Sequence, residues 1–417
     1  MALLNEQTRN FISKHSGDDV RQLALKYVGA EGVDMKQALC QISGLQTARR
    51  KLPSWGNTEG IVYPPGISME QCSGEQSARY KATVAARLVT GKTSSCAGNI
   101  VFADITGGFG VDFSFIAGAL GGGNGDGCVY VERQEVLCKI AKNNFPLLGL
   151  YNAEIICGDG LEFIRNADNV SLVYLDPARR DGNGARTYDI KDCTPDAIGL
   201  MPLLLDKADM VMIKLSPMLD WRKAVCDLGN NVTEVHIVSA GNECKELLFV
   251  IMRGVSEPLH VFCVNDGCVV DYYADCLGTS QEWGACRGEV LMENMEGMWL
   301  YEPNASVMKA GCFGIIESRY GVRQIAVNSH LFVGESLVAD FPGRSFRIRA
   351  VATMNRKELK EVLKDIVKAN ITVRNFPLSV AALRKRLRIA DGGDDYIFAT
   401  TLSDGSHILI IGNRFFK

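Results

Sequence analysis

From Asn99 onward, short runs of β-branched and apolar residues alternate with helical stretches. The runs are NIVFADI, CVYVE, AEIICGD, VSLVYLD and MVMIKLSP, followed by the closely spaced VTEVHIVSA and LLFVIMR. Runs that are apolar almost throughout are typical of strands buried on both faces, as in a parallel sheet covered by helices. The alternation therefore predicts a doubly wound α/β sheet of five strands that ends in an antiparallel hairpin.

The regions on either side of this sheet have different patterns. Before it, VRQLALKYVG, MKQALCQISGLQTARRKL and EQSARYKATVAARLVTG place apolar residues at helical spacing. After it, HVFCV, GCVVDYY and MWLYEP indicate strands, with a helix around 305–320. We therefore expect four parts, which are a helical region, the sheet, a small α+β domain and a last domain, over residues 1–98, 99–257, 258–343 and 344–417.

The last domain has clear local signals. FRIRAVAT predicts a strand, and Asn355 with Glu358 predicts a capping box ahead of the helix LKEVLKDIVKA. Ser379 is the predicted N-cap of a second helix, SVAALRKRLRI. DYIFATTL and HILIIG flank Asp404 and Gly405, which predicts a hairpin.

Composition excludes several classes of protein. Hydrophobic residues make up 47% of the chain, so extensive disorder is not expected. No run of about 18 apolar residues occurs, so we expect no membrane partner. The chain starts without the basic and apolar regions of a signal peptide, and its 14 cysteines show no zinc spacing. We expect a cytoplasmic protein with reduced thiols and no metal.

The first strand leads into a glycine-rich turn within NIVFADITGGFGVDF. Gly108 and Gly110 let the backbone approach a ligand closely, and the following helix adds unpaired N–H groups. A dinucleotide fingerprint has a third glycine where this chain has Phe113. Asp104, at the end of the strand, instead suits a cofactor with a cationic amino-acid end, such as S-adenosylmethionine (SAM). An ordinary strand–helix turn is the alternative.

Two further strands end in carboxylates. Glu132 follows Gly110 by 22 residues, where a carboxylate accepts hydrogen bonds from ribose hydroxyl groups. Asp159 closes the third strand and is able to accept from an adenine amino group. Either residue alone would be an ordinary strand end. Together with Asp104 they predict a cofactor site, because ligands of such sheets bind at the carboxyl edge.

The fourth strand runs into DPARRD, with Asp176, Pro177 and Arg179. This resembles the Asp/Asn-Pro-Pro-aromatic pattern of amino methyltransferases, in which the acid and a proline carbonyl accept hydrogen bonds from the target amine. Ala178 replaces the second proline and Arg179 the aromatic residue. An arginine plane stacks on a base or forks onto a phosphate, so the target atom stays open.

The fifth strand ends in KLSP. Methylation at carbon 5 of a pyrimidine needs a cysteine nucleophile, commonly just before a proline at this place or in the preceding loop. Ser216 stands there, and DPARR has no cysteine, so the sequence disfavours that covalent route. Lys214 is either a functional residue or a solvated strand end.

Two other places are left with two interpretations each. The helix before the first strand carries Glu75, Arg79, Tyr80 and Lys81. It either folds over the pocket or packs with one face in solvent. His330, in NSHLF, faces the target pocket only in the less favoured interpretation.

Residues 99–255 resemble a class I SAM-dependent methyltransferase, and DITGGFGVD is similar to the first motif of bacterial small-subunit rRNA guanine-N2 methyltransferases. The whole layout resembles a bacterial family that joins such a core to a ferredoxin-like domain and a C-terminal THUMP-like domain. The stretches that carry this second resemblance are WLYEPNASVMKAG, NSHLF, FRIRAV, NFPLSVAALRKRL and DGGDDYIFATTL.

The resemblance implies a Rossmann-like, seven-stranded methyltransferase sheet with an N-terminal helical region and C-terminal small α+β domains. It implies SAM as the cofactor and, through the THUMP-like domain, a structured RNA such as tRNA or rRNA as the partner. The residues assigned to SAM are Asp104, Thr106, Gly108, Gly110, Glu132 and Asp159. Asp176, Pro177 and Arg179 would hold the acceptor, an exocyclic nitrogen of a base.

Other functions remain open. One is a noncatalytic RNA-binding protein that retains a SAM-binding fold, and another is a methyltransferase that acts on protein or a small molecule. An NAD(P) oxidoreductase is disfavoured by Phe113. The sequence identifies neither the RNA, nor the methylated atom, nor the oligomeric state.

The formal net charge of -3 hides a gradient. Residues 344–417 contain 15 basic and 7 acidic residues, a formal charge of +8, whereas the rest of the chain has a formal charge of -11. Part of the positive charge lies on one helix, at Arg384, Lys385, Arg386 and Arg388. These four residues are candidates for binding an RNA backbone. The alternative is a helix face that docks on the acidic part of the chain.

Overall fold

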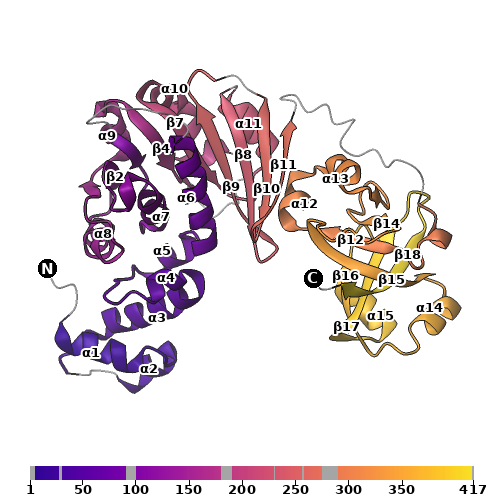
Figure 1. Cartoon of the computed structure of the whole chain (residues 1–417). Helices are drawn as coiled ribbons and strands as arrows, with labels where there is room; N and C mark the ends of the chain where they lie inside the picture. The colour runs from indigo at the N-terminus through magenta and orange to yellow at the C-terminus, as the bar shows by residue number, and fades with distance from the viewer. Residues whose placement is uncertain are drawn as a thin grey trace. The chain divides into compact units, whose positions relative to one another are not determined.

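The computed structural model describes residues 5–27, 31–90, 100–179, 190–229, 231–255, 258–274 and 290–415. The chain divides into two compact units (Figure 1). The first contains residues 1–235 and 245–257, and the second contains residues 236–244 and 258–417. No described helix is long and apolar enough to cross a membrane. Within the same ranges, no three His, Cys, Asp or Glu side chains gather as a metal site.

The first unit begins with the helical region that the sequence predicts. Asn5, Asp19 and Asp34 each accept a backbone N–H three residues later, which begins the first three helices at defined residues. The helices of this region are α1 (Glu6–His15), α2 (Val20–Lys26), α3 (Met35–Lys51), α4 (Pro53–Gly56), α5 (Gly66–Gln71) and α6 (Glu75–Thr90).

The main sheet of the first unit is α/β and mostly parallel, as predicted. Its strands are β1 (Ile100–Asp104), β2 (Cys128–Glu132), β3 (Glu154–Cys157), β4 (Val170–Leu175), β7 (Ala208–Leu215) and β9 (Glu243–Met252). A further strand, β8 (Val232–Ala240), begins in this unit. The order β9-β7-β4-β1-β2-β3 is parallel except for β9, which runs antiparallel to β7. The strand order reverses between β1 and β4, so a crevice opens where their carboxyl ends meet.

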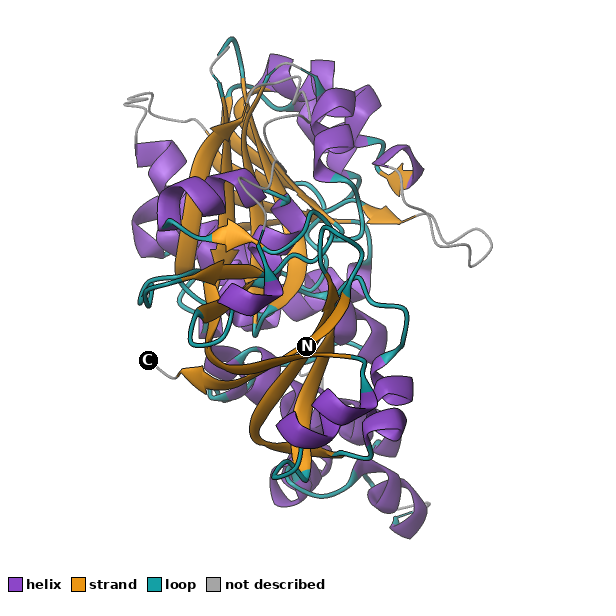
Figure 2. Ribbon diagram, turned by 90° about the vertical axis from the view of Figure 1, so that its right-hand side faces the viewer, coloured by secondary structure: helices purple, strands orange, loops and turns teal. Residues whose placement is uncertain are grey.

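Helices cover this sheet; they are purple in Figure 2, and the strands are orange. They are α7 (Val111–Ala119), α8 (Glu135–Leu147), α9 (Gly160–Asn166), α10 (Ala197–Lys207) and α11 (Trp221–Leu228), with the short strands β5 (Ala178–Arg179) and β6 (Cys193–Thr194) between α9 and α10. Side chains of α6, α7 and α8 form one apolar core with inward-facing residues of β1, β2, β4, β7 and β9. The packing of this core therefore holds the ends of the strands in fixed positions.

The second unit contains a seven-stranded sheet in the order β13-β14-β12-β15-β18-β17-β16. Its strands are β12 (Trp299–Pro303), β13 (Arg323–Gln324), β14 (Phe332–Gly334), β15 (Gly343–Thr353), β16 (Lys368–Val373), β17 (Ala390–Thr401) and β18 (His407–Phe415). Its helices are α12 (Ala305–Ala310), α13 (Phe313–Tyr320), α14 (Arg356–Val362) and α15 (Val380–Leu387). HVFCV and GCVVDYY form β10 (Leu259–Asn265) and β11 (Cys268–Ala274), which pair in the order β11-β10-β8.

Two details of the last domain differ from the sequence prediction. The helix expected through LKEVLKDIVKA ends at Val362, and Lys368–Val373 forms β16, which pairs with β17. Glu358 accepts hydrogen bonds from the backbone and hydroxyl of Thr353, at 2.8 and 2.7 Å, rather than from the N-cap residue Asn355. Strand pairing overrides helical spacing here, because the β-branched run that follows finds a partner in the sheet.

A buried ion network joins α6 to the sheet and to α7. Lys81 is fully buried, and its Nζ lies 2.5 Å from Glu246 Oε1 in β9 and 3.1 Å from Asp112 Oδ1 in α7. The same Nζ donates to Ser73 Oγ at 3.0 Å. One cation thus balances two buried carboxylates from different elements.

Replacing Lys81 with methionine should destabilise the protein by about 3–5 kcal/mol, because two buried carboxylates lose their counterion. Urea unfolding of the full chain measures this loss. Lys139→Met is the matched control, since Lys139 makes an exposed pair with Glu135 and its loss should leave the stability nearly unchanged. Adding Glu246→Gln to Lys81→Met should recover part of the loss. A Lys81→Met variant as stable as wild type would contradict this account of the network.

Candidate functional site

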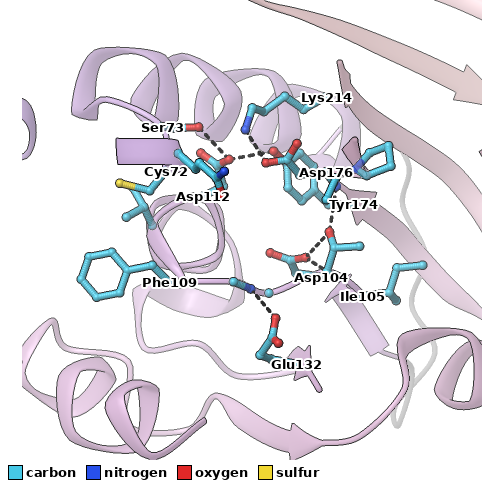
Figure 3. Close-up of a pocket in the computed structure, with 18 of the residues that line it drawn as sticks. Cys72, Ser73, Asp104, Ile105, Phe109, Asp112, Glu132, Tyr174, Asp176 and Lys214 are labelled. Carbon is cyan, nitrogen blue, oxygen red and sulfur yellow. Dashed lines mark hydrogen bonds and ion pairs between the residues drawn. The ribbon is translucent and has the colours of Figure 1, made fainter. Parts of the chain in front are cut away.

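A cavity of about 810 Å³ lies at the carboxyl edge of the main sheet. It is lined by Asp104 at the end of β1, Glu132 at the end of β2, Asp176 just after β4 and Lys214 near the end of β7. Figure 3 shows these side chains converging from neighbouring strands. The volume is in the range of pockets that bind small molecules and cofactors.

The glycines of the turn after β1 have different roles. Gly108 and Gly110 have φ angles of +54° and +83°. A Cβ at Gly110 would lie 2.8 Å from the Phe145 ring, so close packing requires this glycine. A Cβ at Gly108 would meet only a carbonyl oxygen at 3.7 Å, so this glycine leaves the backbone open toward the cavity.

Asp104 is a buried carboxyl group in the floor of the cavity. It is 2% exposed and accepts hydrogen bonds from Thr106, at 2.9 Å from the backbone N–H and 3.3 Å from the hydroxyl. Burial raises the pKa of Asp104 well above its ordinary value, and the negative charges of Asp112 and Asp176 raise it further. A cationic group beside Asp104 would relieve this cost.

Glu132 ties the glycine-rich turn to β2. Its Oε2 accepts from the Gly108 N–H at 2.8 Å and its Oε1 accepts from the Gln134 N–H at 2.8 Å. The carboxylate is therefore held in one position at the cavity wall. Thr106, Gly108 and Gly110 line the same cavity, so the structure brings five of the six predicted cofactor residues together.

Asp159 is the predicted cofactor residue that lies elsewhere. Its side chain caps α9, with Oδ1 accepting from the Leu161 N–H at 2.7 Å and the Glu162 N–H at 3.1 Å. It lines a separate hollow with Cys157 and Gly158 rather than the cavity of Asp104. An aspartate just before a helix is a common N-cap, which accounts for its position without a ligand.

Asp176 and Lys214 form an ion pair beside the cavity, with the Lys214 ammonium group donating to Asp176 Oδ2. The Asp176 N–H donates to the Thr106 hydroxyl at 2.7 Å, which links this loop to the turn after β1. Burial lowers the pKa of Lys214, but the charges of Asp176, Asp112 and Glu246 outweigh it and raise the pKa overall. Lys214 is thus a half-buried, paired residue of the site and not a solvated strand end.

The other predicted acceptor residues follow Asp176 directly. Pro177 lines the cavity, and Arg179 is the second residue of β5. Ser216 and Pro217, after β7, also line it. The backbone therefore carries residues of the fourth and fifth strand ends to one side of the cavity.

Asp112 is a site residue that the sequence interpretation missed. Its Oδ2 accepts from Tyr174 at 2.7 Å and from Ser73 at 2.9 Å, and all three line the cavity (Figure 3). Burial raises the pKa of Asp112, but the charges of Lys81 and Lys214 more than compensate and lower it overall. The available signal was Lys81 itself, a lysine on the apolar face of α6 between Ala78 and Ala85.

The helix before the first strand packs rather than covers the site. Glu75 accepts from the Ser54 backbone at 2.8 Å and pairs with Arg79, and neither residue lines the cavity. The cavity is instead lined by the segment that precedes α6, including Gln71 and Cys72.

The four predicted RNA-binding residues lie on and just after α15 in the second unit. Arg384 donates to Asp391 at 2.5 Å and to the Ala369 carbonyl at 3.1 Å. Lys385 and Arg386 are exposed, as is Arg388 at the C-cap. Arg384 therefore holds the helix against its neighbours, and the other three present their charge to solvent.

Comparisons with known proteins add to this geometry. Residues 343–414 match the model of a THUMP domain-like family, and residues 299–342 match a ferredoxin-like domain. A solved structure of a candidate methyltransferase from Porphyromonas gingivalis W83 is 27% identical, covers 99% of this chain and 100% of its own, and has a TM-score of 0.80. Two proteins from Mycobacterium tuberculosis strains, each named an uncharacterized S-adenosylmethionine-dependent methyltransferase, are 26% identical over 270 residues. That match covers 64% of this chain and 69% of each of theirs.

These matches confirm the resemblance noted from the sequence. The chain is a homologue of S-adenosylmethionine-dependent methyltransferases, with ferredoxin-like and THUMP-like domains in its C-terminal part. Its fold is that of the P. gingivalis protein over nearly the whole length.

Replacing Asp104 with asparagine should stabilise the protein increasingly as pH rises. Because the pKa of Asp104 is raised in the folded state, that state keeps a proton which the unfolded state releases. Between the pKa of Asp104 in the unfolded state and its pKa in the folded state, the wild type therefore loses about 1.4 kcal/mol of stability per pH unit. Asp104→Asn avoids this loss.

Urea unfolding between about pH 5 and about pH 9 measures the difference in stability between the two proteins. Carboxyl groups that titrate alike in both proteins cancel in this difference. Asp159→Asn is the control, since asparagine caps a helix as well as aspartate does. A stability difference between Asp104→Asn and wild type that stays constant over this range would contradict the prediction.

Proposed function

We propose that this protein is a SAM-dependent methyltransferase that acts on a base of structured RNA, tRNA or rRNA, at an exocyclic nitrogen. The observation that carries the proposal is the cavity at the carboxyl edge, which brings Asp104, Glu132 and Asp176 together. The SAM-dependent methyltransferases named among its homologues support the cofactor. Its THUMP-like domain supports an RNA partner.

The residues of the cavity fit SAM in their chemistry. Asp104 is a fully buried carboxyl group whose charged form is disfavoured until a cation approaches, which suits the amino-acid end of SAM. Glu132 is held at the wall by two backbone N–H groups and keeps lone pairs for ribose hydroxyl groups. Gly108 leaves the backbone open beside them. Asp159 caps α9 through Oδ1, and we assign its other oxygen, Oδ2, to the adenine amino group.

SAM supplies a methyl group already activated for transfer. The protein's own task is then to exclude water and to orient the acceptor. We assign Asp176 and the Pro177 carbonyl as acceptors of hydrogen bonds from the target amine, which aims the nitrogen lone pair. Lys214 balances the charge of Asp176 and fixes its carboxylate, so it is a positioning residue. Arg179, two residues after Pro177, is assigned to the target base or its phosphate.

The charge distribution supports an RNA substrate. Residues 344–417 have a formal charge of +8, and Lys385, Arg386 and Arg388 are exposed there. Such side chains bind a phosphate backbone with an affinity that falls as salt rises. Arg384 contributes by holding α15 in place.

Incubation with tritiated SAM and total RNA from a strain that lacks this protein tests the proposal. Wild type should transfer label to RNA, and nucleoside mass spectrometry should then identify an N-methylated base. Asp176→Ala should lower transfer by about 100-fold or more while RNA affinity is retained, because the acceptor loses its orientation. Asp196→Asn, at the exposed N-cap of α10, is the matched control and should leave transfer unchanged.

The other outcomes separate the alternatives. RNA binding by wild type without transfer to any RNA would favour a noncatalytic RNA-binding protein. Label that enters protein or small molecules of an extract, and not RNA, would favour a methyltransferase of another substrate class. Either result would overturn the proposed function.

A further inference from the structure

A second cluster of charged side chains lies within the second unit. Glu302 belongs to β12, His330 to the segment before β14, and Arg344 to β15, while Arg374 follows β16. The first two residues fall in the ferredoxin-like match and the two arginines in the THUMP-like match. Strands β12 and β15 are neighbours in one sheet (Figure 1). In their antiparallel register Glu302 is opposite Arg344.

One buried carboxylate holds both arginines. The Glu302 side chain is 4% exposed. Its Oε2 accepts from Arg344 through both Nε, at 2.8 Å, and Nη2. Its Oε1 accepts from Arg374 Nη2 at 3.1 Å. The two guanidinium groups are therefore fixed in position by the same residue.

Arg344 alone would balance the charge of Glu302, although both of its hydrogen bonds go to Oε2 and Oε1 depends on Arg374. One guanidinium supplies the full countercharge of one carboxylate, so Arg374 adds a surplus positive charge to the cluster. The two arginines differ in their Nε groups. The Nε of Arg344 donates to Glu302, whereas the Nε of Arg374 is buried and has no hydrogen-bond partner among the described residues. An unpaired buried donor costs free energy, so Arg374 has a hydrogen-bonding group that its pair with Glu302 does not satisfy.

Both arginines also face solvent in part. The side chains of Arg344 and Arg374 are 31% and 35% exposed, so neither arginine is enclosed by the fold as the carboxylate of Glu302 is. Each guanidinium has five N–H groups, of which Arg344 gives two to Glu302 and Arg374 gives one. Donors remain for a second acceptor.

His330, in the segment before β14, has a constrained backbone. It has a φ of +52°, a backbone conformation that non-glycine residues rarely adopt, and its ring stacks on Phe313 with centroids 4.8 Å apart. Burial lowers the pKa of His330, and the charge of Arg374 lowers it further. Backbone strain of this kind is typical of binding sites.

We propose that Arg344 and Arg374, held by Glu302, bind a phosphate group of the RNA backbone. The proposal rests on the proposed RNA substrate and adds a specific contact to it. Guanidinium groups match phosphate in planar, bidentate geometry, and Glu302 removes the entropic cost of ordering them. Exposed Lys385 and Arg386 on α15 are not held in this way, so they give general attraction, whereas this cluster fixes a position on the RNA.

Titration of the arginine Nε–Hε signals of the full chain with inorganic phosphate tests the site without RNA. Arg374→Lys identifies the Arg374 signal by its loss. The signals of Arg374 and Arg344 should shift and saturate, while that of Arg323, exposed on β13, should stay in place. No shift at Arg374 would overturn the site.

RNA binding at several salt concentrations tests the assignment to RNA. Arg374→Gln should weaken binding by about tenfold and lower the slope of log affinity against log salt by about one, as loss of one phosphate contact predicts. Arg323→Gln is the matched control and should change neither. Thermal melting of both variants verifies that they fold, and the phosphate titration of wild type stands even if Arg374→Gln does not fold.

The two proposals fail in different ways. A phosphate shift at Arg374 with unchanged RNA affinity in Arg374→Gln would overturn the RNA contact and leave methyl transfer untouched. Absence of methyl transfer to RNA would overturn the proposed function, whereas the phosphate titration would still report on the site.

Discussion

The buried ammonium group of Lys81 determines much of the first unit. It lies between Asp112 and Glu246 and so joins α6, α7 and β9 through buried charges. Asp112 follows the glycine-rich turn by two residues and also accepts from Tyr174 in β4. The position of the turn, and with it the wall of the cavity, therefore depends on one ion network whose partners cannot be removed singly without a large cost.

The cavity itself is costly for the fold. Burial raises the pKa of Asp104, and the negative charges of Asp112 and Asp176 raise it further. Lys214 offsets part of this by pairing with Asp176. Sites that place like charges together gain that free energy back when a ligand of opposite charge binds. The arrangement is thus understandable as preparation for a cationic ligand, although it opposes folding at high pH.

Sequence reasoning predicted the sheet and most of the cavity, because apolar runs and strand-end carboxylates follow from local rules. Asp104 and Glu132 meet at one edge since parallel strands end there together. Asp159 obeys the same rule but caps its helix, a competing local use of the same side chain. Lys81 could not be placed from local pattern, because its partner Glu246 lies 165 residues away. The strand at Lys368–Val373 was missed for a similar reason, since pairing with β17 decides it.

Binding of SAM by the wild type and Asp104→Asn, measured by equilibrium dialysis across pH, tests the central claim most directly. If Asp104 receives the cationic end of SAM, wild type should bind more tightly as pH rises and the carboxyl group loses its proton. Asp104→Asn should bind much more weakly, with little dependence on pH from this group. Undetectable binding by wild type at millimolar SAM, or equal affinity of the variant at every pH, would contradict the account.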